Sequence, residues 1–543
     1  MRAVKPRVLV AEEIADAGLA LLAEVAEVDS AVGATRAELL ARLPGAAGLV
    51  VRSATRVDAE LIAAGPALRV VGRAGTGTDN IDLEAATRAG ILVVNAPNAN
   101  ALSAAEHTLA LLLSLARRVP EGDRSVRSGG WERKRLGGVE LAGKTLGVVG
   151  LGRIGRLVAE RARAFGMHLL VLDPFMSGDP ASALGAERAA GLEDLMSRSD
   201  FVTLHVPLTG ETRGLIGEEA LRHARPGLRL VNTSRGGVVD EEALAAALRA
   251  GRVAGAALDV FASEPPAGSP LLTLPQVVVT PHLGASTHEA QARAGVEVAG
   301  AVAAALRGEL VPTAVNVELG TGMPDEWQPY LPVAEALGAA FLALARGLPA
   351  VLRVEVGGKL SGSSCRPLSL AALKGALGPV SEGPVTYVNA LPLARERGLH
   401  LEEESLPGAA GYSSVVRLVG EVEGRAISVA GAVLPRKGPA LVEVLGREIE
   451  LPLGGHLLLI RHDDRPGIIG RVGTFLGEQG VGIADLVVAR PGEGPGGLLG
   501  LVVDRRLDEE AAAALRRLTG VADAWPVDLP QIQMESSQPT PRP

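Results

Sequence analysis

A glycine-rich turn that joins an apolar strand to a helix constrains this fold more than any other feature. The strand is predicted over Thr145–Val149 and the helix over Ile154–Phe165, with Gly150, Gly152 and Gly155 forming a GxGxxG turn between them. The first glycine allows the tight turn, the second lets a pyrophosphate approach the backbone, and the third lets the helix pack on the strand. The pattern therefore predicts a dinucleotide bound at the start of the helix.

A carboxylate at the end of the next strand narrows the choice of dinucleotide. Asp173 lies 18 residues after Gly155 and follows a strand predicted over His168–Leu172. It can accept hydrogen bonds from the adenosine ribose and would repel a 2′-phosphate, so we expect NAD rather than NADP. The alternative is an ordinary strand–helix turn with a surface aspartate, which the register of strand, glycines, helix and acid disfavours.

Short apolar strands alternate with helical segments through the first part of the chain, and again from Gly143 onward. This alternation predicts parallel sheets flanked by helices. Because 543 residues exceed what one core holds, we expect three or four domains. The first group of strands is predicted at Arg7–Val10, Gly48–Val51, Arg69–Val71 and Ile91–Val94, and a second group continues at Phe201–His205, Leu228–Asn232, Ala256–Asp259 and Val277–Thr280.

The pattern changes after the helix predicted over Thr287–Arg307. Residues 317–452 mix helices with β-like runs, and residues from about 456 to 527 follow the order β-α-β-β-α-β. The polar, proline-rich residues 531–543 are expected to be disordered.

Composition excludes several classes of protein. A net charge of −8 without a long basic block argues against nucleic acid as a partner. Cys365 is the only cysteine, which excludes an intrachain disulfide and a cysteine-based metal site. The histidines lack metal-ligand spacing, so no metal is predicted. With no signal peptide and no apolar run of membrane length, we expect a cytoplasmic protein.

Three polar residues follow predicted strand ends late in the second group of strands. They are Arg235, Glu264 and His282, and each stands beside a turn fixed by glycine or proline. Oxidation of an alcohol needs a base for the hydroxyl proton, which a histidine supplies and a carboxylate partner would hold in place. Arginine's planar fork suits a substrate carboxylate. Any one of the three alone would be an ordinary capping, surface or structural residue, but the set predicts a dehydrogenase of a 2-hydroxy acid.

These segments resemble the D-isomer-specific 2-hydroxyacid dehydrogenases, and within that family the members that act on a phosphorylated acid. The resemblance spans residues 1 to about 316 and rests on specific stretches at Val51–Arg56, Val71–Gly77, Asn95–Asn100, Trp131–Lys134, Gly150–Gly155, Asn232–Gly237, Asp259–Pro266 and Thr280–Thr287.

The resemblance implies an α/β fold in which a Rossmann-type NAD-binding domain is inserted into a flavodoxin-like substrate domain. The predicted limits are 1–98 with 284–316 for the substrate domain and 99–283 for the nucleotide domain. An α+β intervening domain over 317–452 and a C-terminal βαββαβ domain over 455–530, similar to an ACT domain, are predicted to follow.

The resemblance also implies roles for individual residues. Arg235, Glu264 and His282 are the implied catalytic residues. The implied cofactor-binding residues are Gly150, Gly152, Arg153, Ile154, Gly155, Asp173, Val206, Thr233, Ser234, Asp259, Gly284 and Ala285. The implied substrate-binding residues are Arg52, Ser53, Arg73, Gly75, Asn100, Arg133 and Lys134, of which Arg133 and Lys134 are expected to reach across from a neighbouring subunit, or else to be solvated surface cations.

The implied reaction is oxidation of 3-phospho-D-glycerate with NAD, the entry to L-serine synthesis, by a homo-oligomer whose expected size is a tetramer. Interconversion of 2-hydroxyglutarate and 2-oxoglutarate is a further implied activity. An amino-acid effector is implied at His462 and Asp464, although Gly482 stands where serine-inhibited relatives have asparagine. The alternative for this domain is a βαββαβ unit that serves oligomerisation alone. Two alternatives remain: another D-2-hydroxy acid as substrate, or an NAD-sensing scaffold that binds partner proteins.

Overall fold

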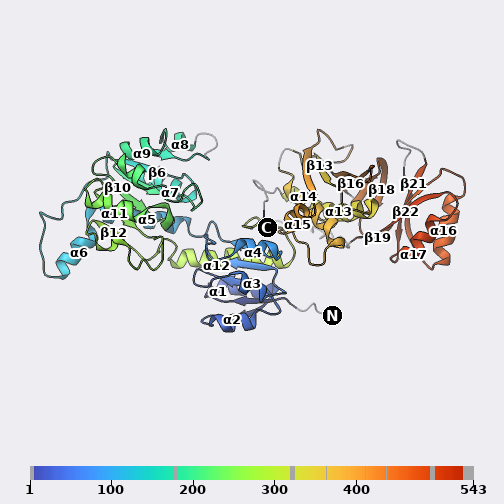
Figure 1. Ribbon diagram of the computed structural model, residues 1–543, viewed down its shortest axis with the longest axis horizontal. Helices are drawn as coiled ribbons and strands as arrows, with labels where there is room; N and C mark the ends of the chain where they lie inside the picture. The colour runs from blue at the N-terminus through green and yellow to red at the C-terminus, as the bar shows by residue number, and fades with distance from the viewer. Residues whose placement is uncertain are drawn as a thin grey trace, which may run out of the picture.

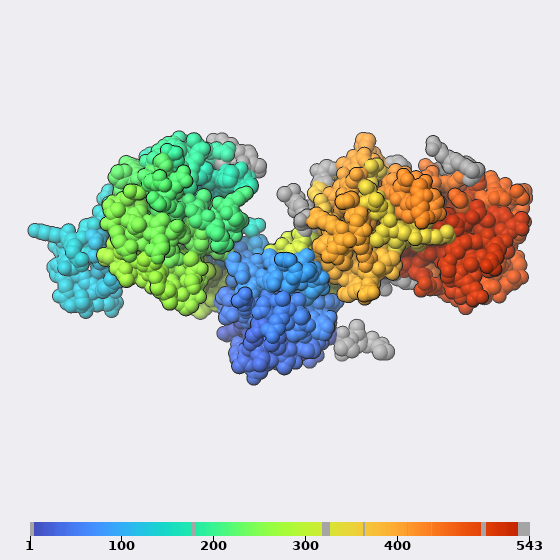
Figure 2. All heavy atoms as spheres, viewed as in Figure 1, coloured from blue at the N-terminus to red at the C-terminus, as the bar shows by residue number. Residues whose placement is uncertain are grey.

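The computed structural model describes residues 5–175, 180–317, 325–361, 364–409, 411–435, 437–489 and 496–529. The prediction of disorder for 531–543 lies outside these residues. Three lobes follow one another along the long axis of the molecule (Figure 1), and the space-filling view separates them in the same way (Figure 2). Among the described residues no helix combines the length and apolar character needed to cross a membrane.

The N-terminal lobe is a five-stranded parallel sheet with the order β2-β1-β3-β4-β5. Helix α12 (His288–Leu306) follows the central sheet in the sequence but returns to this lobe and packs on α1 (Asp16–Val25). The two helices approach closely, because a side chain on Gly18 would collide with the backbone of Gly295. The strands are β1 (Arg7–Val10), β2 (Glu27–Ser30), β3 (Ala46–Val51), β4 (Val70–Arg73) and β5 (Leu92–Asn95), and the other helices are α2 (Arg36–Arg42), α3 (Ala59–Ala63) and α4 (Leu83–Arg88).

The second lobe along the sequence, called the central lobe for its place in the chain, lies at the left end of the molecule in Figure 1. It is a seven-stranded parallel sheet with the order β12-β11-β10-β9-β6-β7-β8. The order reverses at β6, which is where open α/β sheets bind ligands. Its strands are β6 (Thr145–Val149), β7 (His168–Leu172), β8 (Glu187–Arg188), β9 (Phe201–Leu204), β10 (Arg229–Asn232), β11 (Gly255–Leu258) and β12 (Val277–Val279). Its helices are α5 (Ala101–Arg117), α6 (Val119–Arg127), α7 (Arg153–Ala164), α8 (Pro180–Ala183), α9 (Leu192–Arg198), α10 (Glu218–Arg222) and α11 (Glu241–Arg249).

The C-terminal lobe contains two sheets that share one hydrophobic core. The first has the order β14-β13-β15-β16-β17-β18 and packs on α13 (Leu331–Ala345), which also contacts the second sheet, β20-β21-β19-β22. The elements of the first part are β13 (Val351–Gly358), α14 (Arg366–Leu377), α15 (Ala390–Glu396), β14 (His400–Ser405), β15 (Ser414–Val422), β16 (Arg425–Leu434), β17 (Gly438–Val444) and β18 (Arg447–Pro452). The second part, with the predicted βαββαβ order, consists of β19 (Gly455–His462), α16 (Ile468–Glu478), β20 (Ile483–Val488), β21 (Gly497–Val503), α17 (Glu509–Arg516) and β22 (Val521–Leu529).

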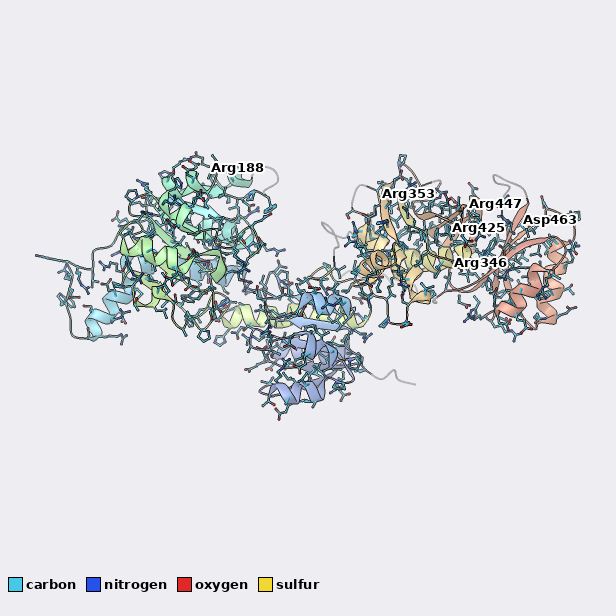
Figure 3. The ribbon with its side chains drawn as sticks, in the orientation of Figure 1. Arg188, Arg346, Arg353, Arg425, Arg447 and Asp463 are labelled. Carbon is cyan, nitrogen blue, oxygen red and sulfur yellow. The ribbon has the colours of Figure 1, made fainter. Side chains whose placement is uncertain are left out.

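One arginine joins the two sheets of the C-terminal lobe. Arg346, which follows α13, forms an ion pair with Asp523 at 2.6 Å and stacks over the ring of Trp525 at 5.8 Å, and Figure 3 labels it between the two parts. Trp525 is itself buried in the shared core. The two sheets are therefore packed as one body.

Candidate functional site

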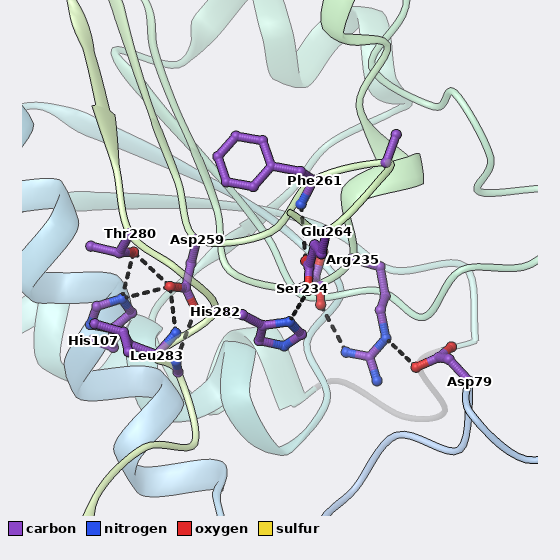
Figure 4. Close-up of polar contacts among 12 residues, drawn as sticks. Asp79, His107, Ser234, Arg235, Asp259, Phe261, Glu264, Thr280, His282 and Leu283 are labelled. Carbon is purple, nitrogen blue, oxygen red and sulfur yellow. Dashed lines mark hydrogen bonds and ion pairs between the residues drawn. The ribbon is translucent and has the colours of Figure 1, made fainter. Parts of the chain in front are cut away.

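A histidine–carboxylate pair stands at the carboxyl end of the central sheet. Oε2 of Glu264 lies 2.8 Å from Nδ1 of His282, and a carboxylate can only accept, so Nδ1 carries the shared proton and Nε2 is left for a substrate (Figure 4). The other oxygen of Glu264 accepts the N–H of Phe261 at 3.1 Å. This second bond fixes the carboxylate, which in turn fixes the imidazole ring.

The turn that carries His282 is held by a buried acid. Asp259, which follows β11, has no exposed surface and accepts the N–H groups of Leu283 and Gly284 at 2.7 and 2.8 Å, while its backbone oxygen accepts the N–H of His282. Burial would raise the pKa of Asp259, but hydrogen bonds from His107, Thr280 and this backbone outweigh burial and lower it. The ionised acid holds His282 at a φ of 55°, a backbone conformation that few residues other than glycine adopt.

Arg235 connects the central lobe to the N-terminal lobe. It follows β10, and its Nε lies 3.2 Å from the carboxylate of Asp79, which follows β4 in the other sheet (Figure 4). Its Nη1 donates to the backbone oxygen of Ser234 at 2.8 Å. A side chain on Gly77 would lie close to the Arg235 guanidinium and the Asp79 carboxylate, so this glycine leaves room for their ion pair.

Arg73 is the last residue of β4 and lies near the ion pair of Arg235 and Asp79. Among the described residues its Nε is buried without a hydrogen-bond partner. Burial and the nearby charge of Arg235 lower the pKa of Arg73, and Arg52 adds to this repulsion. A side chain on Gly75 would collide with the Arg73 guanidinium, so this glycine leaves it room. The carboxylates of Asp79 and Glu12 oppose this shift only in part, and a half-buried cation beside two other arginines is suited to a multiply charged anion.

The remaining predicted substrate residues fall into two groups. Arg52 and Ser53 lie on the loop after β3, and Asn100 precedes α5, where its side chain accepts a hydrogen bond from Thr76 at 2.7 Å. Arg133 and Lys134 are exposed on the segment after α6, which protrudes from the central lobe on the side away from the N-terminal lobe (Figure 2). Within one chain the structure therefore does not bring these two cations close to Arg52, Arg73 and Arg235.

The GxGxxG turn forms a cradle that fits a dinucleotide. Gly150 has a φ of 90°, and a side chain on Gly155 would lie 2.1 Å from the backbone oxygen of Gly150. A side chain on Gly152 would instead meet nothing within 4 Å. This open space lies at the N-terminus of α7, where the backbone N–H groups attract a pyrophosphate.

The other predicted cofactor residues surround this cradle or lie along the same sheet edge. Asp173 accepts the N–H of Leu151 at 2.8 Å and that of Phe175 at 2.9 Å, which ties β7 to the glycine turn. Thr233 lies 2.7 Å from the hydroxyl of Thr108. The others are Arg153 and Ile154 at the start of α7, Val206 after β9, Ser234 bonded to Asn232, and Gly284 and Ala285 after His282.

Replacing Gly152 or Gly155 with alanine is expected to have different effects. Gly152→Ala places a methyl group in open space, so the melting temperature should hold while the Kd for NADH rises about tenfold or more, equivalent to roughly 1.4 kcal/mol. Gly155→Ala should lower stability by about 1–3 kcal/mol, because its methyl collides with the backbone. Fluorescence titration with NADH and thermal unfolding test both, and equal loss of stability in the two variants would contradict this account.

A cavity lies in the C-terminal lobe. It has a volume of roughly 310 Å³ and is lined by His462, Asp464 and the first residues of α16. His462 is buried, its Nδ1 is 2.9 Å from the backbone oxygen of Asp463, and its Nε2 has no partner among the described residues. The structure thus brings together the two residues predicted to hold an effector.

Sequence reasoning missed several residues of the candidate site. Asp79, Asn80, Glu12 and His107 all contact the site or the loops that form it. Asp79 and Asn80 lie two and three residues after Gly77, the last residue of the glycine-rich stretch after β4, which was a usable signal. Glu12 and His107 had no comparable signal, because each acts through a contact with a distant segment.

The fold, the cradle and the three polar residues define an NAD-dependent D-2-hydroxyacid dehydrogenase. Residues 109–284 match the family described as D-isomer specific 2-hydroxyacid dehydrogenase, NAD binding domain. Residues 326–445 match the D-3-phosphoglycerate dehydrogenase intervening domain, and residues 456–520 match the ACT domain. The predicted fold class and the predicted NAD cofactor are thereby confirmed.

Relatives match nearly the whole chain. D-3-phosphoglycerate dehydrogenase of Mycobacterium leprae is 47% identical over 94% of this chain and 97% of its own, and that of Bacillus subtilis is 38% identical over 96% and 100%. The chain belongs to the D-3-phosphoglycerate dehydrogenase family.

Among solved structures, a glyoxylate reductase from Paecilomyes thermophila is 31% identical with a TM-score of 0.53, covering 58% of this chain and 98% of that one. The holo form of D-mandelate dehydrogenase from Rhodotorula graminis is 29% identical with a TM-score of 0.54, over 57% and 98%.

Proposed function

We propose that this enzyme oxidises 3-phospho-D-glycerate at C2 to 3-phosphohydroxypyruvate with NAD, the first step of L-serine biosynthesis. The observation that carries the choice of substrate is Arg73, a half-buried guanidinium that lies near the charge of Arg235 and whose buried Nε has no hydrogen-bond partner among the described residues. The carboxylates of Asp79 and Glu12 only partly offset this repulsion, and a phosphate dianion would add negative charge and hydrogen-bond acceptors that an unphosphorylated acid lacks. The names of the relatives support the same substrate.

The side chains have separate tasks in this reaction. Arg235 binds the substrate carboxylate, and in the absence of substrate the carboxylate of Asp79 occupies this place beside it. Arg73 and Arg52 bind the phosphate. Nε2 of His282 accepts the proton of the C2 hydroxyl, and Glu264 at 2.8 Å stabilises the resulting imidazolium. NAD, when bound along the Gly150–Gly155 cradle, supplies the acceptor for the hydride that leaves C2. The products are a 2-oxo acid, NADH and a proton.

Initial rates of NADH formation at alkaline pH test this proposal, because the reaction releases a proton. We expect 3-phospho-D-glycerate to have a kcat/KM at least about 10²-fold above those of D-glycerate and D-2-hydroxyglutarate, since each charge-assisted hydrogen bond is worth about 1.5–3 kcal/mol. Turnover of only the unphosphorylated acids would remove the serine-pathway assignment. No turnover with any acid, from protein that binds NADH, would favour the alternative of an NAD-sensing scaffold.

The protruding segment supports a homo-oligomer as part of this function. Trp131 is 76% exposed on it, and Val119 and Val126 on α6 are exposed as well. An apolar cavity of roughly 470 Å³ lies beside the catalytic pair, lined by Phe261, Glu264, Pro265, Pro266, Leu272, Val279, Thr280, Pro281 and His282. A second copy that covers these surfaces would bring Arg133 and Lys134 to the neighbouring cleft.

Removal of the Trp131 ring should weaken this assembly. Trp131→Ala is expected to shift the sedimentation coefficient toward that of a single chain, because exposed aromatic residues carry much of the binding energy of an interface. The matched control is Phe175→Ala, another exposed aromatic of the central lobe that lies outside the protruding segment. Wild-type protein that sediments as a single chain would contradict the proposed oligomer.

The cavity at His462 supports an amino-acid effector. Its position at the N-terminus of α16 suits a carboxylate, and the unpaired Nε2 offers a further polar contact. Calorimetric titration with serine and glycine, with His462→Ala as control, tests this proposal, and the absence of heat would leave the lobe a role in assembly alone.

A further inference from the structure

The loop that carries Arg52 is held from one side by a single carboxylate. Oε1 of Glu12 accepts the N–H of Arg52 at 2.8 Å and that of Thr55 at 2.9 Å, and Oε2 accepts the N–H of Ala54 at 3.1 Å. Glu12 follows β1 and the loop follows β3, so the contact spans two adjacent strands of the N-terminal sheet. One side chain thus ties down most of the N–H groups of the loop.

An amide holds the same loop from the other side. Nδ2 of Asn80 donates to the backbone oxygens of Arg52 and Thr55 at 2.8 and 2.7 Å, and its backbone oxygen accepts the N–H of Val57 at 2.8 Å. Among the described hydrogen bonds, none uses the N–H of Ser53. The loop is therefore fixed at both ends, and the N–H of the exposed residue Ser53 remains between them for an anion.

The charge of Glu12 needs an explanation, because a carboxylate opposes the binding of a phosphate. Burial would raise the pKa of Glu12, but backbone hydrogen bonds from Thr55, Arg52 and Ala54 outweigh burial and lower it, so the side chain is ionised at neutral pH. Three charge-assisted bonds absorb much of that charge locally. The arrangement makes sense if phosphate binding depends more on a fixed conformation of this loop than on the net charge around it.

We propose that Glu12, together with Asn80, is a positioning residue that sets the preference for a phosphorylated acid by holding the Arg52–Thr55 loop in its phosphate-binding form. This inference rests on the proposed function, since it concerns the phosphate of that substrate. Glu12 acts through Arg52 and Ser53 and takes no part in the proton transfer at His282. Its loss should therefore alter KM for the phosphorylated acid and leave kcat nearly intact.

The test compares Glu12→Gln with Glu13→Gln, which removes the same charge from an exposed neighbour whose side chain has no hydrogen bond or ion pair among the described residues. Steady-state kinetics are measured with 3-phospho-D-glycerate and with D-glycerate. In Glu12→Gln we expect KM for the phosphorylated acid to rise about tenfold, as for the loss of one charge-assisted hydrogen bond. We expect KM for D-glycerate and kcat for both acids to stay within about twofold, and Glu13→Gln to match the wild type.

The direction of the change separates positioning from simple charge. If Glu12 acted only as an opposing charge, Glu12→Gln would lower KM for the phosphorylated acid, and that result or an unchanged KM would overturn the inference. An equal rise in KM for both acids would also overturn it, because it would indicate general damage to the cleft. Asn80→Asp, which replaces the donor by an acceptor facing two carbonyl groups, provides a second variant and should raise the same KM selectively.

The failure of this inference and that of the proposed function can be told apart. A wild-type enzyme with no preference for the phosphorylated acid would refute the proposed substrate, whatever Glu12 does. A wild-type preference that survives unchanged in Glu12→Gln would refute the positioning role alone. NADH binding and thermal unfolding of each full-length variant show whether it has folded.

Discussion

Replacing His282 with alanine is expected to lower kcat for the oxidation of 3-phospho-D-glycerate by about 10²- to 10⁴-fold, the range that a positioned general base supplies. The imidazole is the only side chain of the Glu264–His282 pair with a nitrogen left free for the substrate hydroxyl. Its ring is exposed enough for removal to leave the core intact. Stopped-flow or steady-state NADH formation measures the effect, with NADH affinity as the test of folding.

The Glu264→Gln variant is the matched control for this mechanism. Glutamine keeps the size of the side chain and can still accept a hydrogen bond from Nδ1 of His282, but it cannot stabilise the imidazolium charge. We expect a smaller loss than in His282→Ala, about 10- to 100-fold in kcat. An alanine variant at 282 with more than a tenth of the wild-type kcat would refute His282 as the base.

Replacing Arg73 with leucine is expected to lower kcat/KM for the phosphorylated acid by about 10²- to 10³-fold, because a guanidinium–phosphate contact combines several charge-assisted hydrogen bonds. The value for D-glycerate should change little. Burial and the charge of Arg235 lower the pKa of Arg73, which means that the folded protein bears a cost for this cation. Leucine removes that cost, so the melting temperature without substrate should stay the same or rise.

Arg69→Leu is the control for this experiment. Arg69 is exposed just before the first residue of β4, whereas Arg73 is the last residue of the same strand, so both variants remove one positive charge from one element. Only Arg73→Leu should lose the preference for phosphate. If both acids lost activity equally in Arg73→Leu, its guanidinium would serve the cleft in general and the substrate assignment would lose its main support.

Sequence reasoning went furthest where the chemistry is local. The strand, glycines, helix and acid of residues 145–173 stand close together in the chain, so their spacing alone predicted the dinucleotide cradle. Arg235, Glu264 and His282 were predicted from the rule that parallel strands place ligands at their carboxyl ends. Their common sheet edge followed from the prediction that each stands after a strand of one parallel sheet, although the roles of the individual residues remain predictions.

Contacts between distant segments could not be predicted in the same way. The ion pair of Arg235 with Asp79 joins two different sheets, and the bonds of Glu12 to the Arg52–Thr55 loop cross from one strand to its neighbour. Neither relation appears as spacing in the sequence. The strand β2 (Glu27–Ser30) was also missed, because it has a single strongly apolar residue and a polar composition that favours loops. The limits of the domains and the cytoplasmic location likewise remain predictions.

The most direct test of the central claim is the transfer of deuterium from 3-phospho-D-glycerate labelled at C2 to NAD. We predict that mass spectrometry of the reduced cofactor finds one deuterium per molecule, formed with wild-type enzyme and strongly reduced with His282→Ala. Reduced cofactor without deuterium, or none formed from this acid while D-glycerate labelled at C2 transfers its deuterium readily, would contradict the account.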